Sequence, residues 1–177
     1  MRTPKVPHRE QSKRVRLPHW MALLSLPVVF LLVHVALPWG ISLLSTRHGW
    51  ANGRPGRRNL LALILVGAGT SCIIWCARLH FIASPGSFEM ERTPKYLLVR
   101  GPYTFTRNPI YLSLLAIWFG WALFYGSVAV CVGCVVGWVI VTLLVVPWEE
   151  RELEARFGEA YLRYKNTVPR WLGRTRR

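Results

Sequence analysis

The amino-acid sequence predicts an all-α membrane protein with about four transmembrane helices and a C-terminal amphipathic helix on the cytoplasmic side. Of its 177 residues, 52% are hydrophobic, and the run from Ile110 to Pro147 contains no charged side chain. The length suits one domain, and this composition excludes a disordered tail, a collagen-like fibre and a secreted disulfide scaffold. A net charge of +15 in so apolar a chain indicates anionic lipid headgroups as partners of the basic residues, and not nucleic acid.

The chain opens on a basic arm over residues 1–19, which holds six Lys and Arg side chains and three prolines. We expect this arm to lie in the cytoplasm against anionic headgroups. A cleavable signal peptide is the alternative, but the apolar run that follows is too long for one and no small-residue cleavage site comes after it. Residues 20–177 are therefore predicted to form a single transmembrane domain.

The first two predicted spans come from separate apolar runs. One covers residues 20–39, where Trp20 and Trp39 stand at the ends as interfacial anchors and Pro27 is expected to kink the helix. The other covers residues 59–77 and follows a loop rich in Gly and Arg. Both runs are close to the length of about 20 residues that a helix needs to cross a bilayer.

The last two predicted spans form a tight hairpin. The uncharged run of about 38 residues would make one helix of roughly 57 Å, nearly twice the thickness of a bilayer core. It is therefore divided into spans over residues 110–125 and 128–147, with a turn at Tyr125-Gly126-Ser127.

Residues 148–166 are predicted to form the amphipathic tail helix. Leu153, Phe157, Tyr161 and Tyr164 recur at helical spacing and so share one apolar face. We expect this face to pack against the membrane domain at its cytoplasmic side.

The distribution of basic residues predicts the orientation of the chain. Four spans place both termini on the same side of the membrane. Of the 23 Lys and Arg residues, 19 lie in the N-terminal arm, in residues 78–109 or in the tail, and four lie in the loop 40–58. By the positive-inside rule we expect an integral multi-pass protein with both termini in the cytoplasm.

Polar residues gather where the third span begins, in Arg107-Asn108-Pro109-Ile110-Tyr111. A structural interpretation is sufficient for part of this motif, because Asn before Pro suits a helix N-cap and Pro suits the first helical position. A functional interpretation adds that a helix N-terminus beside Arg107 binds a carboxylate or a phosphate well. Tyr103 and Tyr111 are near enough in sequence to contribute ring or hydroxyl contacts.

A second polar cluster, Glu149-Glu150, lies where the fourth span meets the tail. Acidic residues at a helix N-terminus are favoured by the macrodipole, which is the structural interpretation. However, Glu149 precedes Leu153 by four residues and so falls on the apolar, inward face. A carboxylate on that face indicates a ligand with a cationic or hydroxyl group.

Other polar or reactive residues point less strongly to function. Small helix-packing residues are the favoured interpretation for the Gly67-Ala68-Gly69 segment and for the paired cysteines, and no metal site is expected. His34 lies within the first span, where it is either a functional polar group or part of a hydrogen bond between helices. His80 lies near the membrane surface, and the direction in which it faces stays open. The cysteine pairs are Cys72 with Cys76 and Cys131 with Cys134.

Two motifs around the helical hairpin carry a family resemblance. Before it stand Arg100-Gly101-Pro102-Tyr103 and Arg107-Asn108-Pro109-Ile110-Tyr111, and after it stand Pro147-Trp148-Glu149-Glu150 and Val168-Pro169-Arg170-Trp171. Together they resemble the isoprenylcysteine carboxyl methyltransferase and phospholipid N-methyltransferase superfamily of integral membrane enzymes. The resemblance covers roughly residues 60–172.

The resemblance implies a methyltransferase that binds S-adenosylmethionine at the cytoplasmic membrane face and needs no metal. Arg107 and Glu150 are the positioning candidates within the implied cofactor pocket. Many members of the superfamily have His at the position of Asn108, so a proton-transfer role for that His does not carry over. The implied cofactor-binding residues are Tyr103, Arg107, Asn108, Pro109, Tyr111, Glu149 and Glu150, together with Gly67 and Gly69 in the preceding helix.

Three functions remain to be distinguished. The first is this methyltransferase, acting on a small hydrophobic or lipidic acceptor whose reactive group is a carboxylate, an amine or a thiol. The second is a non-catalytic small membrane protein that binds anionic lipid or a partner through its basic arms. The third is a carrier of thiols or metal ions built on the paired cysteines. The inward position of Glu149 favours the first.

Overall fold

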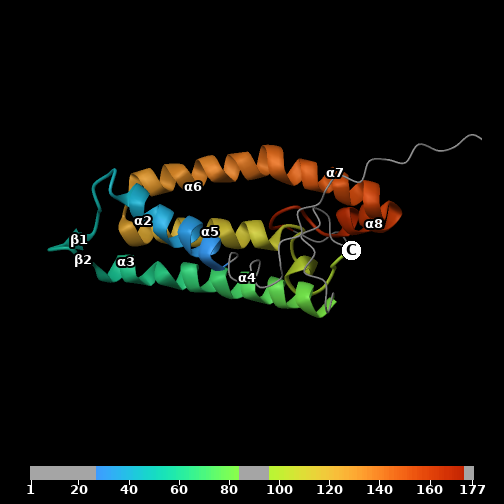
Figure 1. Ribbon diagram of the computed structural model, residues 1–177, viewed down its shortest axis with the longest axis horizontal. Helices are drawn as coiled ribbons and strands as arrows, with labels where there is room; N and C mark the ends of the chain where they lie inside the picture. The colour runs from blue at the N-terminus through green and yellow to red at the C-terminus, as the bar shows by residue number, and fades with distance from the viewer. Residues whose placement is uncertain (1–26, 84–95, 174–177) are drawn as a thin grey trace, which may run out of the picture.

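The computed structural model describes residues 27–83 and 96–173. Within these ranges the chain is mostly helical, and its longest helices run side by side along one axis (Figure 1). The only strands described are β1 (Trp50–Ala51) and β2 (Arg54–Pro55), which form an antiparallel hairpin at one end. The elements of the bundle are the helical segment Pro27–Ser42, which ends in α2 (Leu37–Ser42), then α3 (Arg57–Leu61), α4 (Leu63–Ala83), α5 (Pro109–Tyr125), α6 (Val128–Ile140), α7 (Val146–Phe157) and α8 (Glu159–Thr167).

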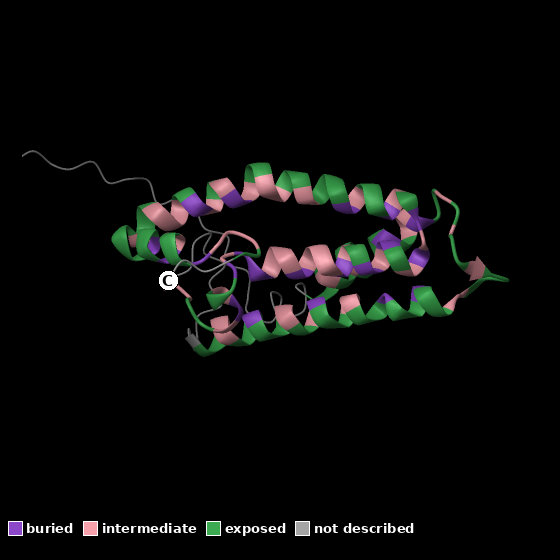
Figure 2. Ribbon diagram, turned by 180° about the vertical axis from the view of Figure 1, so that it is seen from behind, coloured by how far each residue is buried: buried purple, intermediate pink, exposed green. Residues whose placement is uncertain are grey.

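Among the described residues, two helices are long and apolar enough to cross a membrane. They are Arg57–Ile82, with 26 residues, and Val128–Phe157, with 30 residues. Only 17% and 11% of the most apolar stretch of each is buried inside the protein, and Figure 2 shows long exposed stretches along both. Apolar helices that expose their side chains are typical of contact with lipid, so the chain is a membrane protein.

Two further apolar helices, Pro27–Ser42 and Pro109–Tyr125, are shorter. They occupy the positions of the first and third predicted spans, and α5 begins at Pro109 and ends at Tyr125, as the sequence indicated. Residues 20–26 of the first predicted span lie outside the described residues. The predicted number of four membrane crossings therefore stays a prediction.

The packing of α4 against α5 depends on glycines at the crossing. A Cβ atom on Gly69 would lie 2.6 Å from the Ser113 carbonyl oxygen, and one on Gly120 would lie 2.7 Å from Val66 Cγ2. These positions therefore allow the two helices to approach each other closely. Gly69 is thus a packing residue, whereas a Cβ on Gly67 would meet nothing within 4 Å.

The turn between α5 and α6 lies where the sequence predicted it. Gly126 adopts a left-handed conformation with φ of 57°, and a Cβ there would lie 2.0 Å from the His48 carbonyl oxygen. Ser127 then caps α6 by accepting a hydrogen bond of 3.3 Å from the Val130 amide. Asn59 holds this end together, because its side-chain amide donates to the Leu123 and Phe124 carbonyls.

Two π-helical turns interrupt the bundle, each just before a proline. The first, η1 (Leu32–Ala36), is followed by Pro38, and the second, η3 (Val141–Val145), is followed by Pro147. Proline cannot donate a backbone hydrogen bond, and its ring clashes with the carbonyl four residues earlier, so a wider turn relieves both problems. The kink predicted at Pro27 depends on residues outside the described ranges.

The tail departs from the prediction of one separate helix over residues 148–166. The fourth apolar helix continues without a break through η3 into α7, and Gly158 then separates α7 from α8. Gly158 has a φ of 51° and a ψ of −128°, a conformation that is accessible chiefly to glycine. The predicted apolar face is nevertheless formed, because Tyr161 and Tyr164 are buried against Leu153 and Phe157.

Candidate functional site

The predicted polar motifs meet at one end of the bundle, where the start of α5, the helix α7 and the segment after α8 come together (Figure 1). Backbone and side-chain hydrogen bonds hold these pieces in place. The Arg107 amide donates to the Pro169 carbonyl over 2.9 Å. The Thr106 hydroxyl and the Asn108 side-chain amide both donate to the Arg170 carbonyl, over 2.9 and 3.0 Å. The loop before α5 is therefore fixed to residues more than 60 positions later.

Glu150 is the centre of an ion cluster with two arginines. Arg170 donates to it with both Nε and Nη2, over 3.1 and 2.6 Å. Nη1 of Arg107 lies 2.9 Å from the same carboxylate, and the exposed side-chain fractions of Arg107 and Glu150 are only 9% and 7%. Two guanidinium groups against one carboxylate leave a formal charge of +1 in the cluster, so it favours an anion.

Arg107 retains hydrogen-bonding capacity that the described residues do not use. Its Nε and Nη1 atoms are buried, and neither makes a hydrogen bond to any described residue. The contact with Glu150 is close enough for an ion pair but is not aligned as a hydrogen bond. Buried donors without acceptors are costly, and a carboxylate ligand would supply the acceptors.

Glu149 faces α5 and is held by Tyr111. The Tyr111 hydroxyl donates a 3.0 Å hydrogen bond to Oε2 of Glu149. The other oxygen, Oε1, accepts no hydrogen bond from the described residues. Tyr111 therefore orients the carboxylate and leaves one oxygen available for a hydroxyl or an ammonium group.

Tyrosines surround the ion cluster with neutral hydroxyls. Tyr103 lies in the short 3₁₀ turn η2 (Gly101–Thr104); its hydroxyl is 2.9 Å from Nε2 of His80, and its carbonyl accepts a 2.7 Å bond from Tyr164. Burial raises the pKa of Tyr103 and Tyr164, and it raises the pKa of Tyr161 to about 12, with a smaller contribution from nearby Glu150. These hydroxyls therefore stay protonated near neutral pH.

Most of the predicted site residues lie in or beside a polar cluster, which is the ion cluster together with Thr106, Asn108, Tyr111 and Glu149. Gly67 and Gly69 lie on α4, where a Cβ on Gly69 would meet Ser113 and one on Gly67 would meet nothing within 4 Å. Arg107, Asn108, Glu149 and Glu150 lie in the polar cluster as described above. Pro109 is buried at the first position of α5. Asn108 occupies the N-cap position, but its side chain makes no cap hydrogen bond and binds the Arg170 carbonyl instead.

Sequence reasoning missed Arg170 and Thr106 as members of the cluster. Arg170 belongs to the Val-Pro-Arg-Trp motif, yet its partner Glu150 lies 20 residues earlier on another helix. The signal was Glu150 itself, because an acid this deeply buried requires a cation. Sequence reasoning also placed Glu149 as the inward carboxylate, whereas Glu150 is the more buried of the two, with 6% of its surface exposed.

No metal site is described. Within residues 27–83 and 96–173 no group of three or more His, Cys, Asp or Glu residues could hold an ion. All four cysteines in these ranges are free thiols.

Comparisons with known proteins identify a family and a relative. The sequence model of a family described as "Phospholipid methyltransferase" matches residues 58–160, which is more than half of the chain. A protein of Haemophilus influenzae, described as uncharacterized, is 38% identical over 63 residues, which cover 36% of this chain and 100% of that protein. No solved structure matches the chain. The matched region begins at the start of α3 and ends in α8, so it contains Arg107, Asn108, Glu149 and Glu150 of the polar cluster but not Arg170.

Proposed function

The chain belongs to the phospholipid methyltransferase family, and on that premise we propose that it is an S-adenosylmethionine-dependent methyltransferase. The polar cluster around Glu150 holds the cofactor, and the methyl acceptor is a small hydrophobic or lipidic molecule that reaches it from the bilayer. The observation that carries this proposal is Arg107, a buried guanidinium that is ion-paired with Glu150 but whose Nε and Nη1 make no hydrogen bond to a described residue.

The charges of the cluster suit the amino-acid end of the cofactor. Arg107 and Arg170 together exceed the charge of Glu150, so they attract the cofactor's carboxylate. Glu150 keeps both guanidinium groups in place through contacts of 2.6 to 3.1 Å. Its role is thus to position Arg107 and Arg170, and it has little capacity left for the ligand.

Glu149 suits a different part of the cofactor. With Oε2 occupied by the Tyr111 hydroxyl, Oε1 accepts hydrogen bonds from an ammonium group or from ribose hydroxyls. Carboxylates that accept such charge-assisted bonds give both affinity and orientation. Tyr103, whose neutral hydroxyl and carbonyl are fixed by His80 and Tyr164, forms an adjoining wall.

When bound, S-adenosylmethionine supplies an electrophilic methyl group on a sulfonium. The residues of this chain bind it, orient it and keep water away, which are the contributions that transfer between two positioned reactants needs. Arg107 and Glu149 hold opposite charges of the same ligand and so fix its direction. The bundle provides four membrane crossings, with both termini and the cluster on the cytoplasmic side.

The proposal is tested by calorimetric titration of S-adenosylhomocysteine into detergent-purified protein. The wild type binds, and Glu149→Gln and Arg107→Lys each weaken binding at least about tenfold, or roughly 1.4 kcal/mol. The matched controls Glu159→Gln and Arg163→Gln change exposed residues of α8 and leave the affinity within about twofold. Gln keeps an acceptor for Tyr111, and Lys keeps a positive charge, so both substitutions are mild.

Two results would contradict the proposal. One is the absence of binding by well-folded wild type, with and without added lipid, which would favour the non-catalytic lipid-binding protein. The other is binding that Glu149→Gln and Arg107→Lys leave as strong as the controls do, which would move the cofactor away from this cluster.

A further inference from the structure

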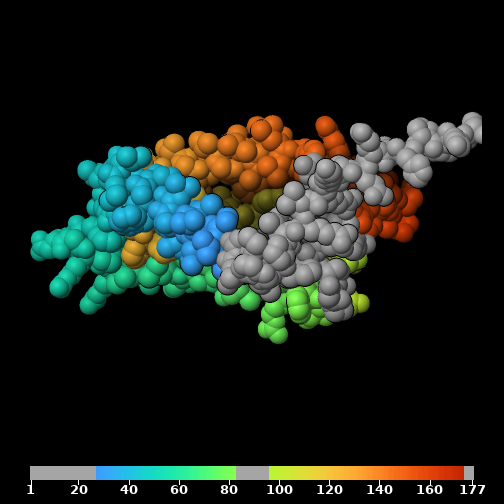
Figure 3. Space-filling model, in the orientation of Figure 1, coloured from blue at the N-terminus to red at the C-terminus, as the bar shows by residue number. Residues whose placement is uncertain are grey.

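A cavity of about 230 Å³ lies between the first helical segment, α5 and α6. In Figure 3 the atoms of α5 are recessed between the blue N-terminal segment and the orange α6. Its walls are almost wholly apolar, with Leu114, Leu115 and Trp118 on α5 and Gly137 and Trp138 on α6. His34 and Tyr111 bring the main polar groups to its surface.

Both π-helical turns contribute to this cavity. His34 belongs to η1, Val141 begins η3, and both residues line the cavity. A π turn carries one extra residue and widens the helix, and such turns occur frequently at functional sites. Pro38 and Pro147 provide a local cause for each turn. Two independent distortions of separate helices thus converge on the same space.

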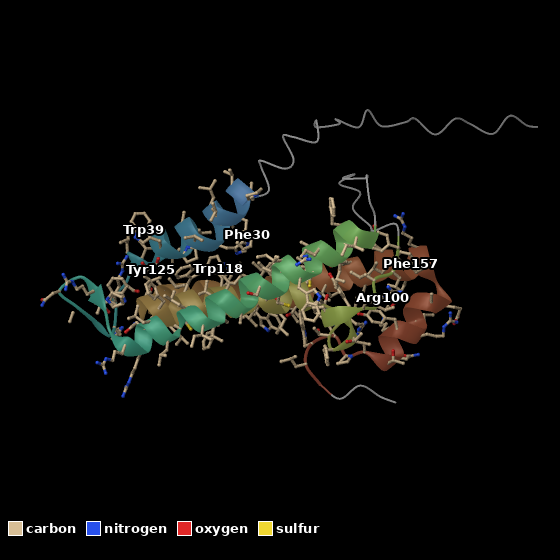
Figure 4. The ribbon with its side chains drawn as sticks, turned by 90° about the horizontal axis from the view of Figure 1, so that it is seen from below. Phe30, Trp39, Arg100, Trp118, Tyr125 and Phe157 are labelled. Atoms are coloured by element: carbon tan, nitrogen blue, oxygen red, sulfur yellow. The ribbon has the colours of Figure 1, made fainter. Side chains whose placement is uncertain are left out.

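His34 presents a defined hydrogen-bond donor at this cavity. The indole N–H of Trp118 donates to Nδ1 of His34 over 3.0 Å, and Figure 4 shows Trp118 on α5 near the helix that carries Phe30. Because indole only donates, Nδ1 must accept, so the ring is neutral and its proton is on Nε2. Nε2 makes no hydrogen bond to the described residues, so it is available to an acceptor atom on a ligand.

The cavity adjoins the polar cluster through one residue. Tyr111 lines the cavity, and its hydroxyl binds Glu149. A molecule in the cavity therefore contacts the same Tyr111 side chain that orients Glu149 in the proposed cofactor site.

We propose that this cavity binds the methyl acceptor, that the acceptor is an amphiphile with a single apolar chain or ring, and that Nε2–H of His34 donates to an oxygen or nitrogen on it. This inference rests on the proposed function and names the substrate class. The volume of about 230 Å³ falls below the roughly 300–1,000 Å³ of pockets for drug-sized ligands, so its size suits one short chain better than both long chains of a diacyl lipid. His34 becomes a specificity-determining residue supplied by a segment that lies outside the family match.

The test is photo-labelling in phosphatidylcholine nanodiscs with a methyl decanoate that carries a diazirine. We expect saturable labelling of peptides that contain Trp118 or Trp138, with competition by unlabelled methyl decanoate. Decane, which has no hydrogen-bond acceptor, competes at least about tenfold less well, and dioleoylphosphatidylethanolamine does not compete. Labelling that decane or the diacyl lipid suppresses as well as the ester does would overturn the proposal.

Variants test whether the labelling depends on the cavity and on His34. Gly137→Leu fills the cavity, since a Cβ there meets nothing within 4 Å, and it abolishes the labelling. The matched control Gly40→Leu also has free space but lies outside the cavity, so it leaves the labelling intact. His34→Phe removes the advantage of the ester over decane, and His34→Gln, which can both accept and donate, restores part of it.

The inference and the proposed function fail in distinguishable ways. Binding of S-adenosylhomocysteine is measured on every variant, and size-exclusion chromatography checks their folding. Intact cofactor binding with labelling that Gly137→Leu and His34→Phe do not change would refute the acceptor site alone. Absent cofactor binding by the wild type, with labelling as expected, would refute the methyltransferase and leave the cavity as an amphiphile site. If Gly137→Leu does not fold, the acceptor site is tested by comparing how strongly the ester and decane compete for labelling in His34→Phe and in His34→Gln.

Discussion

Replacing Glu150 by Gln removes the negative charge from the centre of the ion cluster. Glu150 contacts Arg107 and Arg170 over 2.6 to 3.1 Å. The amide keeps the shape of the side chain and one acceptor oxygen. Its NH₂ group, however, faces a guanidinium, and Arg107 is left charged and buried without a counter-ion. We expect Glu150→Gln to destabilise the fold strongly.

The size of the effect follows from burial. The side chains of Arg107 and Glu150 are exposed by only 9% and 7%, whereas that of Arg170 is exposed by 36%. Breaking a buried pair typically costs roughly 3–5 kcal/mol, because one charge is left uncompensated. Arg170 adds little, since water solvates it once it is released. For a chain of this length a loss of about 3 kcal/mol corresponds to a Tm lower by roughly 6–12 °C.

Thermal unfolding in detergent measures this loss through the reactivity of buried thiols. Cys76 and Cys134 are free and buried, whereas Cys131 is exposed and Cys72 half-buried. With Cys72 and Cys131 replaced by Ala in every protein compared, a maleimide dye that fluoresces on reaction reports when the bundle opens. Glu159→Gln, an exposed acid in α8, is the control and leaves Tm within about 2 °C. The double variant Arg107→Leu/Glu150→Leu removes both buried charges and is expected to be more stable than Glu150→Gln. A Tm for Glu150→Gln that equals the control would refute the interpretation of Glu150 as a buried counter-ion.

Two further predictions concern packing and pH. Gly69→Ala places a Cβ 2.6 Å from the Ser113 carbonyl oxygen, so we expect it to lower the free energy of unfolding by roughly 1–3 kcal/mol. In the control Gly67→Ala the Cβ meets nothing within 4 Å, so Tm should be unchanged or slightly higher. Equal losses of Tm in the same thermal assay would contradict the tight α4–α5 crossing. Burial raises the pKa of Tyr161 from 10 to about 12, so the folded state holds this proton more tightly than the unfolded state does, and the associated stability is present below pH 10 and is lost as the pH rises toward 12. Tm measured from pH 9 to 12 should therefore fall less steeply for Tyr161→Phe than for the wild type, and equal slopes would contradict the burial of this hydroxyl.

The sequence predicted the elements whose ends are set by local chemistry. Gly126 lies between two uncharged runs and needs the left-handed conformation that it adopts, and Pro109 suits the first turn of α5. The division of the tail at Gly158 was missed because one glycine inside a helical pattern is compatible with a continuous helix. The sequence also did not predict that the helix which begins at Val128 continues through α7. The charges that begin at Glu149 end the apolar run, but they do not end the helix.

The candidate site was predictable where both partners carry a signal in their own segment. Arg107 and Glu150 each belong to a motif, and the structure brings these motifs together at a distance of 2.9 Å. Arg170 reaches Glu150 only because the chain reverses after α8, and no periodicity in the sequence indicates that reversal. His34 was recognised as a polar group in an apolar span, but its tautomer depends on Trp118, which lies 84 residues away.

The helix that runs from α6 through η3 into α7 links the cavity to the ion cluster. Val141 lines the cavity before Pro147, and Glu149 and Glu150 follow two and three residues after that proline. In an α-helix each residue advances the direction of the side chains by about 100°, so one extra residue in η3 rotates all that follows by about that angle. Without the wide turn, Glu150 would leave the side of the helix from which it meets Arg107. The proline at position 147 thus accounts for both features, because the turn that it favours widens the wall of the cavity and directs the carboxylates of α7 toward α5.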